Sequence, residues 1–461
     1  MFKKISRIAA MLLASALIFT ACGNQSADTT AGSTSNSTTN TTSSSGAAGS
    51  ANAIDSIELG KNGPVAIEFW HIQATIYGDA IKEMIAAFNK EYEGKIKVNE
   101  VFQGDYGQLN QKIKAALQGG GLPNVAMAYE NETGEYMKSD VIVPLDDYIN
   151  STKYGLTQQE LDDMLPAVLA RQRLANYGGK TMSWPHGNSA QGVYYNVDLL
   201  GKAGYDAPAK TWDEFEKQCT DIYNKTGVPA LAVGSNPIGS LLTWIRTYGV
   251  TPIEDDSSKV DFDNAATISL LNMMKHLIDS GAAYKADNTE NDFTGGKAAM
   301  EISTTARTSS KVELIGDKFK WNITLIPQGK QGVQNTSLYG GNQVMFKATP
   351  EKQLASWVFL KYFAGPSAQA IYGARTGYFP ATKSSLDQPV LKDNYTKFPQ
   401  KMEAFQNVFP YGIIDSPSPA RSQISDVVLK QAADFFSGKR TAEQTAKLMQ
   451  SEAENALAKY K

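Results

Sequence analysis

Aromatic and carboxylate side chains stand at the ends of three predicted strands. Trp70 and His71 follow the first apolar run, Tyr106 follows the second, and Glu130 follows the third. In open α/β sheets, ligands bind beyond the carboxyl ends of the strands. Aromatic rings pack on the C–H face of a sugar, and carboxylates accept strong hydrogen bonds from its hydroxyls. These residues predict a site for a small polyhydroxylated ligand, although a core position for Trp70 and a cap position for Glu130 are equally open.

Strands and helices alternate through the region that would position these side chains. Strands are predicted at 65–69, 95–102 and 125–129, and apolar residues at helical spacing follow the first two, for example Ile81, Met84, Ile85 and Phe88. Strand, helix, strand, helix, strand implies right-handed crossovers and a mostly parallel sheet with helices on both faces. The fold class is therefore predicted to be α/β.

A second α/β region follows after Trp184-Pro185. Strands are predicted at 192–196 and 343–346. Helices are predicted at 212–225, 265–280, 426–436 and 442–460, and a further one carries Ala355, Val358, Phe359 and Tyr362. With about 400 residues after the polar segment described next, the chain is long enough for two domains.

The first 59 residues do not read as part of this body. Lys3, Lys4 and Arg7 precede an apolar run that is too short to span a bilayer, which predicts an export signal at 1–21. Phe19 to Gly23 resembles a bacterial lipobox with Cys22 as the lipidated residue. Residues 22–59 are rich in Ser, Thr, Asn and Gly, which is typical of a solvated tether.

Composition and motifs exclude several functions. The net charge of −3 gives no reason to expect nucleic acid as a partner. The three histidines lack metal-ligand spacing, and no P-loop, G-x-G-x-x-G or G-x-S-x-G motif occurs. The adjacent Asp146 and Asp147 would project apart, so helix capping explains them better than acid–base chemistry. We expect no catalytic residue, no metal and no cofactor, and with Cys22 used as the anchor Cys219 has no disulfide partner.

Several segments, taken in order, resemble the family 1 extracellular solute-binding proteins of bacterial ABC importers, and most closely the glycerol-3-phosphate-binding type. They cover nearly the whole mature chain: 69–71, 104–106, 129–130, 184–185, 194–196, 210–212, 293–300, 340–341 and 376–380. The resemblance implies the two-lobe type II periplasmic-binding fold, with three crossings near 185–189, 339–340 and 378–383. The implied first lobe is 60–186 plus 340–380, and the second is 187–339 plus 381–461.

The resemblance also implies which residues contact ligand. Combined with the strand-end argument, the predicted set is Trp70, His71, Tyr106, Glu130, Asn188, Ser189, Gly340, Gly341, Tyr378 and Arg421. In the family an arginine near the start of a late helix holds a phosphate, and Arg421 is the nearest counterpart. Glycine at 341 would let backbone approach the ligand closely.

Three hypotheses follow. The first is an extracytoplasmic binding protein for a sugar or oligosaccharide, monomeric, held to the outer face of the cell membrane only by its lipid, and serving ABC transporter permease subunits. The second keeps this fold but makes the ligand glycerol-3-phosphate or a glycerophosphodiester, through Arg421. The third is a surface glycan hydrolase or an adhesin.

Overall fold

The first sheet follows the predicted alternation of strand and helix. In the computed structural model, which describes residues 53–173 and 177–460, β1 runs parallel to β2 from Val65 opposite Ile96 to His71 opposite Phe102. The sheet order is β2 (Ile96–Phe102), β1 (Val65–His71), β3 (Val125–Ala128), β11 (Asn342–Met345), β4 (Trp184–Pro185). The predicted signal segment, Cys22 and most of the tether lie outside the described residues.

Residue alternation explains how this sheet is covered. Ile67, Phe69 and His71 of β1 are buried while Glu68 is exposed, as expected for a strand whose side chains alternate between faces. Helix α2 (Thr75–Glu91) buries the predicted apolar stripe, including Phe88, against the same core. Its neighbours around the first sheet are α3 (Tyr106–Gly119), α4 (Glu130–Lys138), α5 (Asp146–Ile149), α6 (Gln158–Asp163), α7 (Pro166–Ala170), α14 (Pro350–Phe363) and α15 (Pro366–Arg375).

The second sheet is built from the middle and late parts of the chain. Its order is β12 (Gly412–Ile414), β10 (Thr336–Tyr339), β5 (Ser189–Asn196), β8 (Met300–Thr304), β6 (Leu231–Val233), β7 (Ala283–Lys285), and β9 (Trp321–Leu325) also pairs with β5. The helices of this part of the chain are α8 (Val197–Ala203), α9 (Trp212–Thr226), α10 (Leu241–Arg246), α11 (Ala265–Asp279), α12 (Thr289–Thr294), α13 (Thr308–Ile315), α18 (Arg421–Phe436) and α19 (Ala442–Ala458).

The two-lobe α/β class is confirmed, but the sheets are mixed rather than mostly parallel. The strands β2, β1 and β3 are parallel, as predicted, whereas β11 lies antiparallel to β3. In the second sheet, β5 is antiparallel to β8, β9 and β10. The antiparallel strand β11 belongs to a chain segment that returns from the other sheet, so its direction does not follow from local periodicity.

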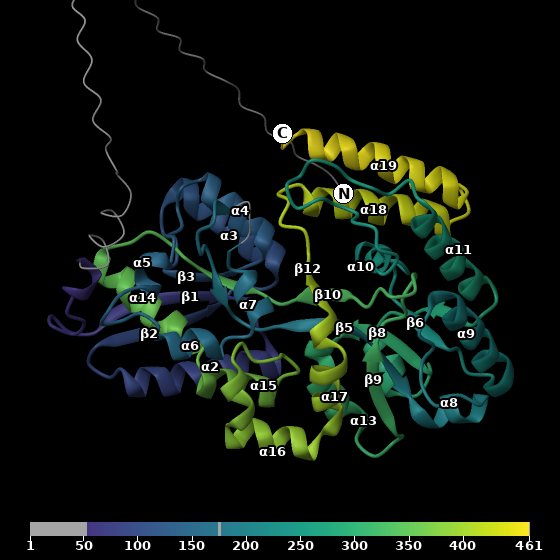
Figure 1. Ribbon diagram of the computed structural model, residues 1–461, viewed down its shortest axis with the longest axis horizontal. Helices are drawn as coiled ribbons and strands as arrows, with labels where there is room; N and C mark the ends of the chain where they lie inside the picture. The colour runs from purple at the N-terminus through teal and green to yellow at the C-terminus, as the bar shows by residue number, and fades with distance from the viewer. Residues whose placement is uncertain (1–52, 174–176, 461) are drawn as a thin grey trace, which may run out of the picture. The chain divides into compact units, whose positions relative to one another are not determined.

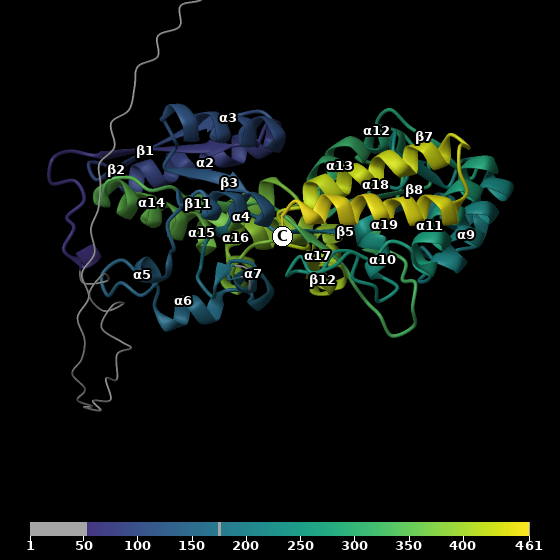
Figure 2. The same ribbon diagram turned by 90° about the horizontal axis from the view of Figure 1, so that it is seen from above.

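Each sheet has its own hydrophobic core. One core includes Phe69, Met84 and Trp357, and the other includes Trp212 and Phe262. In Figure 1 the strands β1, β2 and β3 lie to the left and β5, β6, β8 and β9 to the right, and Figure 2 shows the same separation. We call the elements around the first sheet the first lobe and those around the second sheet the second lobe. All described residues belong to one compact unit, Gly46–Lys461.

The chain passes between the lobes through short connections. It leaves β4 at Pro185 and enters β5 at Ser189, and it leaves β10 at Tyr339 and enters β11 at Asn342. After α15 it continues through α16 (Pro389–Lys397) and α17 (Pro399–Asn407) before β12 joins the second sheet. The lobe boundaries predicted from the sequence stay a prediction.

Helix α18 begins at Arg421 rather than at the predicted Asp426. The reason is local, because the Ser418 hydroxyl and carbonyl accept hydrogen bonds from the backbone N–H groups of Ala420 and Arg421 and start the turn early. Arg421 therefore occupies the first helical position.

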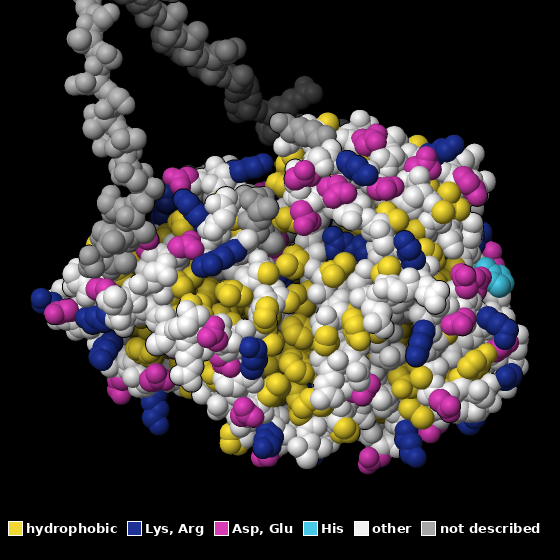
Figure 3. Space-filling model, viewed as in Figure 1, with side chains coloured by type: hydrophobic (Ala, Val, Ile, Leu, Met, Phe, Trp, Pro, Cys, Tyr) yellow, Lys and Arg dark blue, Asp and Glu magenta, His cyan; other side chains and the backbone are white. Residues whose placement is uncertain are grey.

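The surface carries mixed charge. Acidic and basic side chains are interspersed over the face seen in Figure 3 rather than gathered by sign. Within the described ranges, no helix combines the length and apolar composition needed to span a bilayer.

Candidate functional site

Three tyrosines gather beyond the carboxyl ends of the first sheet. Tyr106 begins α3, where Asp105 and Gln108 form a capping box, and Tyr129 is the N-cap of α4. The rings of Tyr106 and Tyr129 lie 4.2 Å apart between centroids. Tyr378 stacks on Tyr372 with the ring centroids 5.2 Å apart. It is close enough to Tyr106 and Tyr129 to raise the pKa of both. We call Tyr106, Tyr129 and Tyr378 the tyrosine cluster.

These phenols are neutral near pH 7, and burial strengthens their preference for the neutral form. Burial raises the pKa of Tyr106, of Tyr129 and of Tyr378, since each hydroxyl would lose solvation on ionising. Neutral hydroxyls both donate and accept hydrogen bonds. The cluster therefore offers flat apolar faces with polar tips, which matches a ligand rich in hydroxyl groups.

Two glycines let the backbone approach this cluster. A Cβ on Gly341 would lie 2.3 Å from Oη of Tyr106, so only glycine permits this spacing. Gly340 has φ +124°, and a Cβ there would lie 1.9 Å from the carbonyl oxygen of Gly187. The two connections between the lobes are thus in direct backbone contact at this point.

Glu130 lies beside the cluster but is paired within the protein. It is the first residue of α4 and is buried. The Arg171 guanidinium donates to its Oε1 at 2.8 Å from Nε and 2.5 Å from Nη2, and Asn342 Nδ2 donates to the same oxygen at 3.1 Å. Sequence reasoning missed Arg171, because an arginine at the end of a short helix carries no motif that marks a buried ion pair.

Asn188 and Ser189 are buried at the first connection. Ser189 pairs with Tyr339 across β5 and β10, and the carbonyl of Asn188 accepts from the backbone N–H of Phe379 at 2.6 Å. The Asn188 side-chain amide has no hydrogen-bond partner among the described residues for its Nδ2, while its Oδ1 lies 3.4 Å from Nη1 of Arg171. Asn188 lies beside Gly340 and shares Arg171 with Glu130, and Ser189 follows it in the chain; contact of either residue with a ligand stays a prediction.

Arg421 is neutralised by a neighbouring carboxylate. Its Nε donates to Oδ2 of Asp415 at 2.7 Å, and its Nη2 contacts the same oxygen. Burial alone would raise the pKa of Asp415, but the guanidinium outweighs this and holds the pKa below its ordinary value. Arg421 also lines a small cavity of about 70 Å³ with Tyr339 and Thr243, whose hydroxyls are hydrogen-bonded to each other.

In the described part of the chain, the rings of Trp70 and His71 make no contact with the rings of the tyrosine cluster. Trp70 is half-buried and its Nε1 donates to Glu68 at 3.2 Å. His71 is buried in the first core, where Nε2 lies 2.6 Å from Glu100 and Nδ1 accepts from the Gln73 backbone N–H. Burial lowers the pKa of His71, so its neutral ring is held as a structural group.

The lobes touch at two further places next to the cluster. Tyr77 Oη donates to the carbonyl of Ala306 at 2.9 Å, and Asn131 Nδ2 donates to Oγ of Ser422 at 3.2 Å. The Tyr77 ring lies 6.0 Å from the Tyr378 ring. Second-lobe residues therefore contact immediate neighbours of the cluster.

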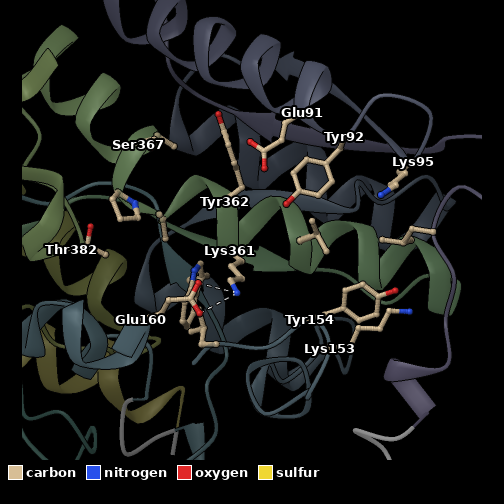
Figure 4. A pocket seen from close by; sticks show the side chains of 18 of the residues that line it. Glu91, Tyr92, Lys95, Lys153, Tyr154, Glu160, Lys361, Tyr362, Ser367 and Thr382 are labelled. Atoms are coloured by element: carbon tan, nitrogen blue, oxygen red, sulfur yellow. Dashed lines mark hydrogen bonds and ion pairs between the residues drawn. The ribbon is translucent and has the colours of Figure 1, made fainter. Parts of the chain in front are cut away.

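A larger cavity lies elsewhere. It has a volume of about 960 Å³, and its lining includes residues that precede β1 and β2. The cavity therefore lies at the amino ends of these strands, whereas the tyrosine cluster lies beyond the carboxyl ends. Figure 4 shows Lys361 beside Glu160, with Tyr92, Tyr154 and Tyr362 around the space. None of the predicted ligand-binding residues lines it. Because its lining belongs almost wholly to first-lobe elements, a ligand there would not connect the two lobes.

Within the described ranges, no three His, Cys, Asp or Glu residues lie together as possible metal ligands. The free cysteine, Cys219, is buried in the second core.

This chain is similar to known proteins over most of its length. It is similar to the sn-glycerol-3-phosphate-binding periplasmic protein UgpB of Pectobacterium atrosepticum, with 23% identity over 86% of this chain and 92% of that protein. Its fold is similar to the GacH receptor of Streptomyces glaucescens (TM-score 0.73, 22% identity) and to UgpB of Mycobacterium tuberculosis (TM-score 0.73, 20% identity). These two matches cover 86% of this chain each, and 100% and 99% of the respective structures.

A family model also matches more than half of the chain. The model for bacterial extracellular solute-binding proteins matches residues 83–400, which include the tyrosine cluster, Glu130 and both glycines. The chain belongs to the bacterial extracellular solute-binding protein family.

Proposed function

We propose that this chain captures a sugar or short oligosaccharide between its two lobes and delivers it to the permease of an ABC importer. The observation that carries the proposal is the tyrosine cluster at the carboxyl edge of the first sheet, flanked by residues of the second lobe. Neutral tyrosines with apolar faces and hydroxyl tips suit a polyhydroxylated ligand. A binding role accords with the family, whose members are solute-binding proteins.

In this proposal the ligand contacts Tyr106, Glu130, Gly341 and Tyr378 from one side and Ser189 from the other. The carboxylate of Glu130 receives all of its hydrogen bonds from described residues on Oε1. Its other oxygen is the proposed acceptor for a ligand hydroxyl. His71 is left out of the proposed set because both of its ring nitrogens are hydrogen-bonded within the first lobe.

A second candidate is glycerol-3-phosphate or a glycerophosphodiester. It is favoured by UgpB of Mycobacterium tuberculosis, whose structure was solved in complex with glycerophosphocholine. Asp415 argues against it, since a phosphate approaching Arg421 would meet a carboxylate that already holds the guanidinium. We therefore rank it after the neutral sugar.

The decisive experiment is a calorimetric titration of the purified protein with maltose, maltotriose, acarbose and glycerophosphocholine. A ligand that binds only the folded state also raises the melting temperature by mass action. We expect at least one neutral saccharide to bind with 1:1 stoichiometry and glycerophosphocholine to bind more weakly. Binding of glycerophosphocholine alone would reverse the ranking of the two candidates.

We further propose that the protein is a monomeric lipoprotein, anchored through Cys22 to the outer face of the cell membrane. The support is the sequence of residues 1–59. Two acyl chains give stable anchoring because each buried methylene contributes about 0.8 kcal/mol. Cys22→Ser is expected to appear in the medium instead of the membrane fraction, and retention in the membrane would reject Cys22 as the anchor.

A further inference from the structure

Arg171 is a buried cation with a place of its own in the fold. It is the C-cap residue of α7, its side chain is 1% exposed, and its partners come from distant parts of the chain. A buried charge is costly unless it is paired and hydrogen-bonded. The hydrogen-bond partners of Arg171 therefore indicate the role of its guanidinium.

On one side, Arg171 fixes the carboxylate of Glu130. Two of its nitrogens converge on Oε1, at 2.8 and 2.5 Å. Asn342 from β11 adds a third hydrogen bond to that oxygen. The carboxylate thus cannot rotate freely, and the direction of its second oxygen is fixed as well.

On the other side, Arg171 reaches the connections between the lobes. Nη2 donates to the carbonyl of Gly340 at 2.7 Å, and Nη1 lies 3.4 Å from Oδ1 of Asn188. Gly340 belongs to the connection from β10 to β11, and Asn188 to that from β4 to β5. The carbonyl of Asn188 also accepts from Phe379, in the segment predicted to form the third crossing.

We propose that Arg171 is a positioning residue that joins the ligand-binding carboxylate to the hinge. One guanidinium holds Glu130 in its orientation and ties together the two connections whose backbones meet at Gly187 and Gly340. Hinge closure changes a few backbone dihedral angles in such connections. Arg171 keeps the connections in register while this happens, so ligand contact and closure are linked. The link to a ligand rests on the proposed function.

Arginine is required for this geometry. Its planar guanidinium carries five N–H donors, whereas lysine is a point charge with three. The contacts of Arg171 point to a carboxylate, a backbone carbonyl and an amide oxygen at once. Lysine would retain the charge but could not satisfy all of them.

Other ionisable groups face Glu130 and bear on any pH test. They come from the start of α4, from the segment after α7 and from α18, and comprise Tyr129, Glu132, Tyr177 and Arg421. Burial raises the pKa of Glu132 and of both tyrosines. Arg421 is already paired with Asp415. Arg171 is the direct counterion of Glu130 within this set.

The test compares Arg171→Lys, Arg171→Met and the double variant Arg171→Met with Glu130→Gln, in the full mature protein. Arg173→Met is the matched control, because Arg173 lies two residues away and makes a half-exposed ion pair with Asp146. The double variant removes both charges, which avoids an unpaired buried carboxylate and keeps the test decisive if Arg171→Met fails to fold.

The first readout needs no ligand. Hydrogen–deuterium exchange should become at least tenfold faster in peptides covering 185–190 and 338–343 in every Arg171 variant, and remain unchanged in Arg173→Met. Strand β6 (Leu231–Val233), deep in the second sheet, serves as the internal reference. Unchanged exchange at the connections, or an equal increase in β6, would overturn the hinge role.

The second readout is affinity for maltotriose and for glycerophosphocholine between pH 5 and 8. We expect Arg171→Lys to bind the active probe at least tenfold more weakly than the parent. Arg171→Met should show a pH dependence that the double variant lacks, since a buried carboxylate without a counterion takes up a proton. Equal pH profiles would reject the positioning of Glu130. If neither probe binds the parent, the proposed ligand class is at fault, and the exchange experiment still decides the hinge role.

Discussion

At the scale of single residues, two charged side chains of the candidate site are each held by an opposite charge. Glu130 is matched by Arg171 and Asp415 by Arg421, at hydrogen-bonding distances. Burial strengthens the preference of the tyrosine cluster for the neutral form. Because Arg171 and Arg421 are already paired, an anionic ligand gains little from them, whereas hydroxyl groups can exchange hydrogen bonds with the site at small cost. This is the physical basis for ranking a neutral saccharide first.

The Arg421–Asp415 pair gives a test of that ranking. Asp415→Asn should free the guanidinium and strengthen binding of glycerophosphocholine, while maltotriose affinity should stay within about threefold, a change of under 1 kcal/mol. Arg421→Ala should likewise leave the saccharide within this range. Calorimetric titration of both variants measures the effects. A large loss of maltotriose binding in Arg421→Ala would mean that the saccharide contacts Arg421 directly.

Tyr378 and Trp70 are expected to contribute differently to saccharide binding, because only Tyr378 belongs to the tyrosine cluster. Tyr378→Ala removes a ring from the cluster and should weaken saccharide binding by about fivefold or more, because an aromatic contact contributes roughly 1 kcal/mol beyond its buried area. Trp70→Ala should weaken it less, since Trp70 is hydrogen-bonded to Glu68 and has no ring contact with the cluster in the described residues. Titration with the same saccharide compares them. The reverse order of effects would move the site toward Trp70.

At the scale of elements, the sequence predicts what local periodicity controls. The first three strands and α2 were expected, because their apolar residues alternate or repeat at helical spacing. The start of α18 and the antiparallel direction of β11 were not, since they depend on Ser418 hydrogen bonds and on a chain return. Tyr106, Glu130 and Gly341, from three of the family segments, lie in one region of the structure, and their contact with a ligand stays a prediction. Arg171 and Asp415 were missed, because long-range charge pairing leaves no local pattern.

The close backbone contact at Gly340 predicts that a side chain at this position destabilises the protein. Gly340→Ala places a side chain at φ +124° and against the carbonyl of Gly187, so both strain and collision oppose it. Gly120→Ala is the matched control, because Gly120 has φ +83° but open space around its Cβ position. We expect the melting temperature to fall more for Gly340→Ala, and ligand affinity to fall only there. Equal melting temperatures would show that the two connections can separate without cost.

The first connection also predicts acid sensitivity. His186 is buried, its Nδ1 has no hydrogen-bond partner among the described residues, and burial lowers its pKa to about 3. The unfolded chain binds a proton there below about pH 6.5, the ordinary value, while the folded protein does not. Stability is therefore lost as the pH falls from 6.5 toward 3.

His186→Phe should reduce this loss. The His186 ring stacks on Phe363 at 4.8 Å, so phenylalanine can occupy a similar position, although the contact with Tyr372 is given up. Melting temperatures at pH 7 and pH 4.5 measure the effect, and the drop between them should be smaller in the variant than in the parent. An unchanged drop would assign the acid sensitivity to other groups, such as His71 or the paired carboxylates.

At the scale of the whole folded body, ligand binding and closure are one equilibrium. A ligand shifts the balance between open and closed forms only by its different affinity for the two. The lobes already meet through Tyr77 with Ala306 and through Asn131 with Ser422. These contacts favour the closed form without ligand, and they lower the free energy that a ligand must supply.

Tyr77→Phe tests this contribution. It retains the ring beside Tyr378 and Arg307 but removes the hydrogen bond to Ala306, worth about 1 kcal/mol. The closed population should fall about fivefold relative to the open one, which small-angle scattering detects as a larger radius of gyration without ligand and a parent-like radius at saturation. Tyr284→Phe removes a hydrogen bond to Asp292 within the second lobe and should change neither. If both variants scatter like the parent, with and without ligand, the Tyr77 contact does not set the opening equilibrium, and closure depends on the ligand and the hinge.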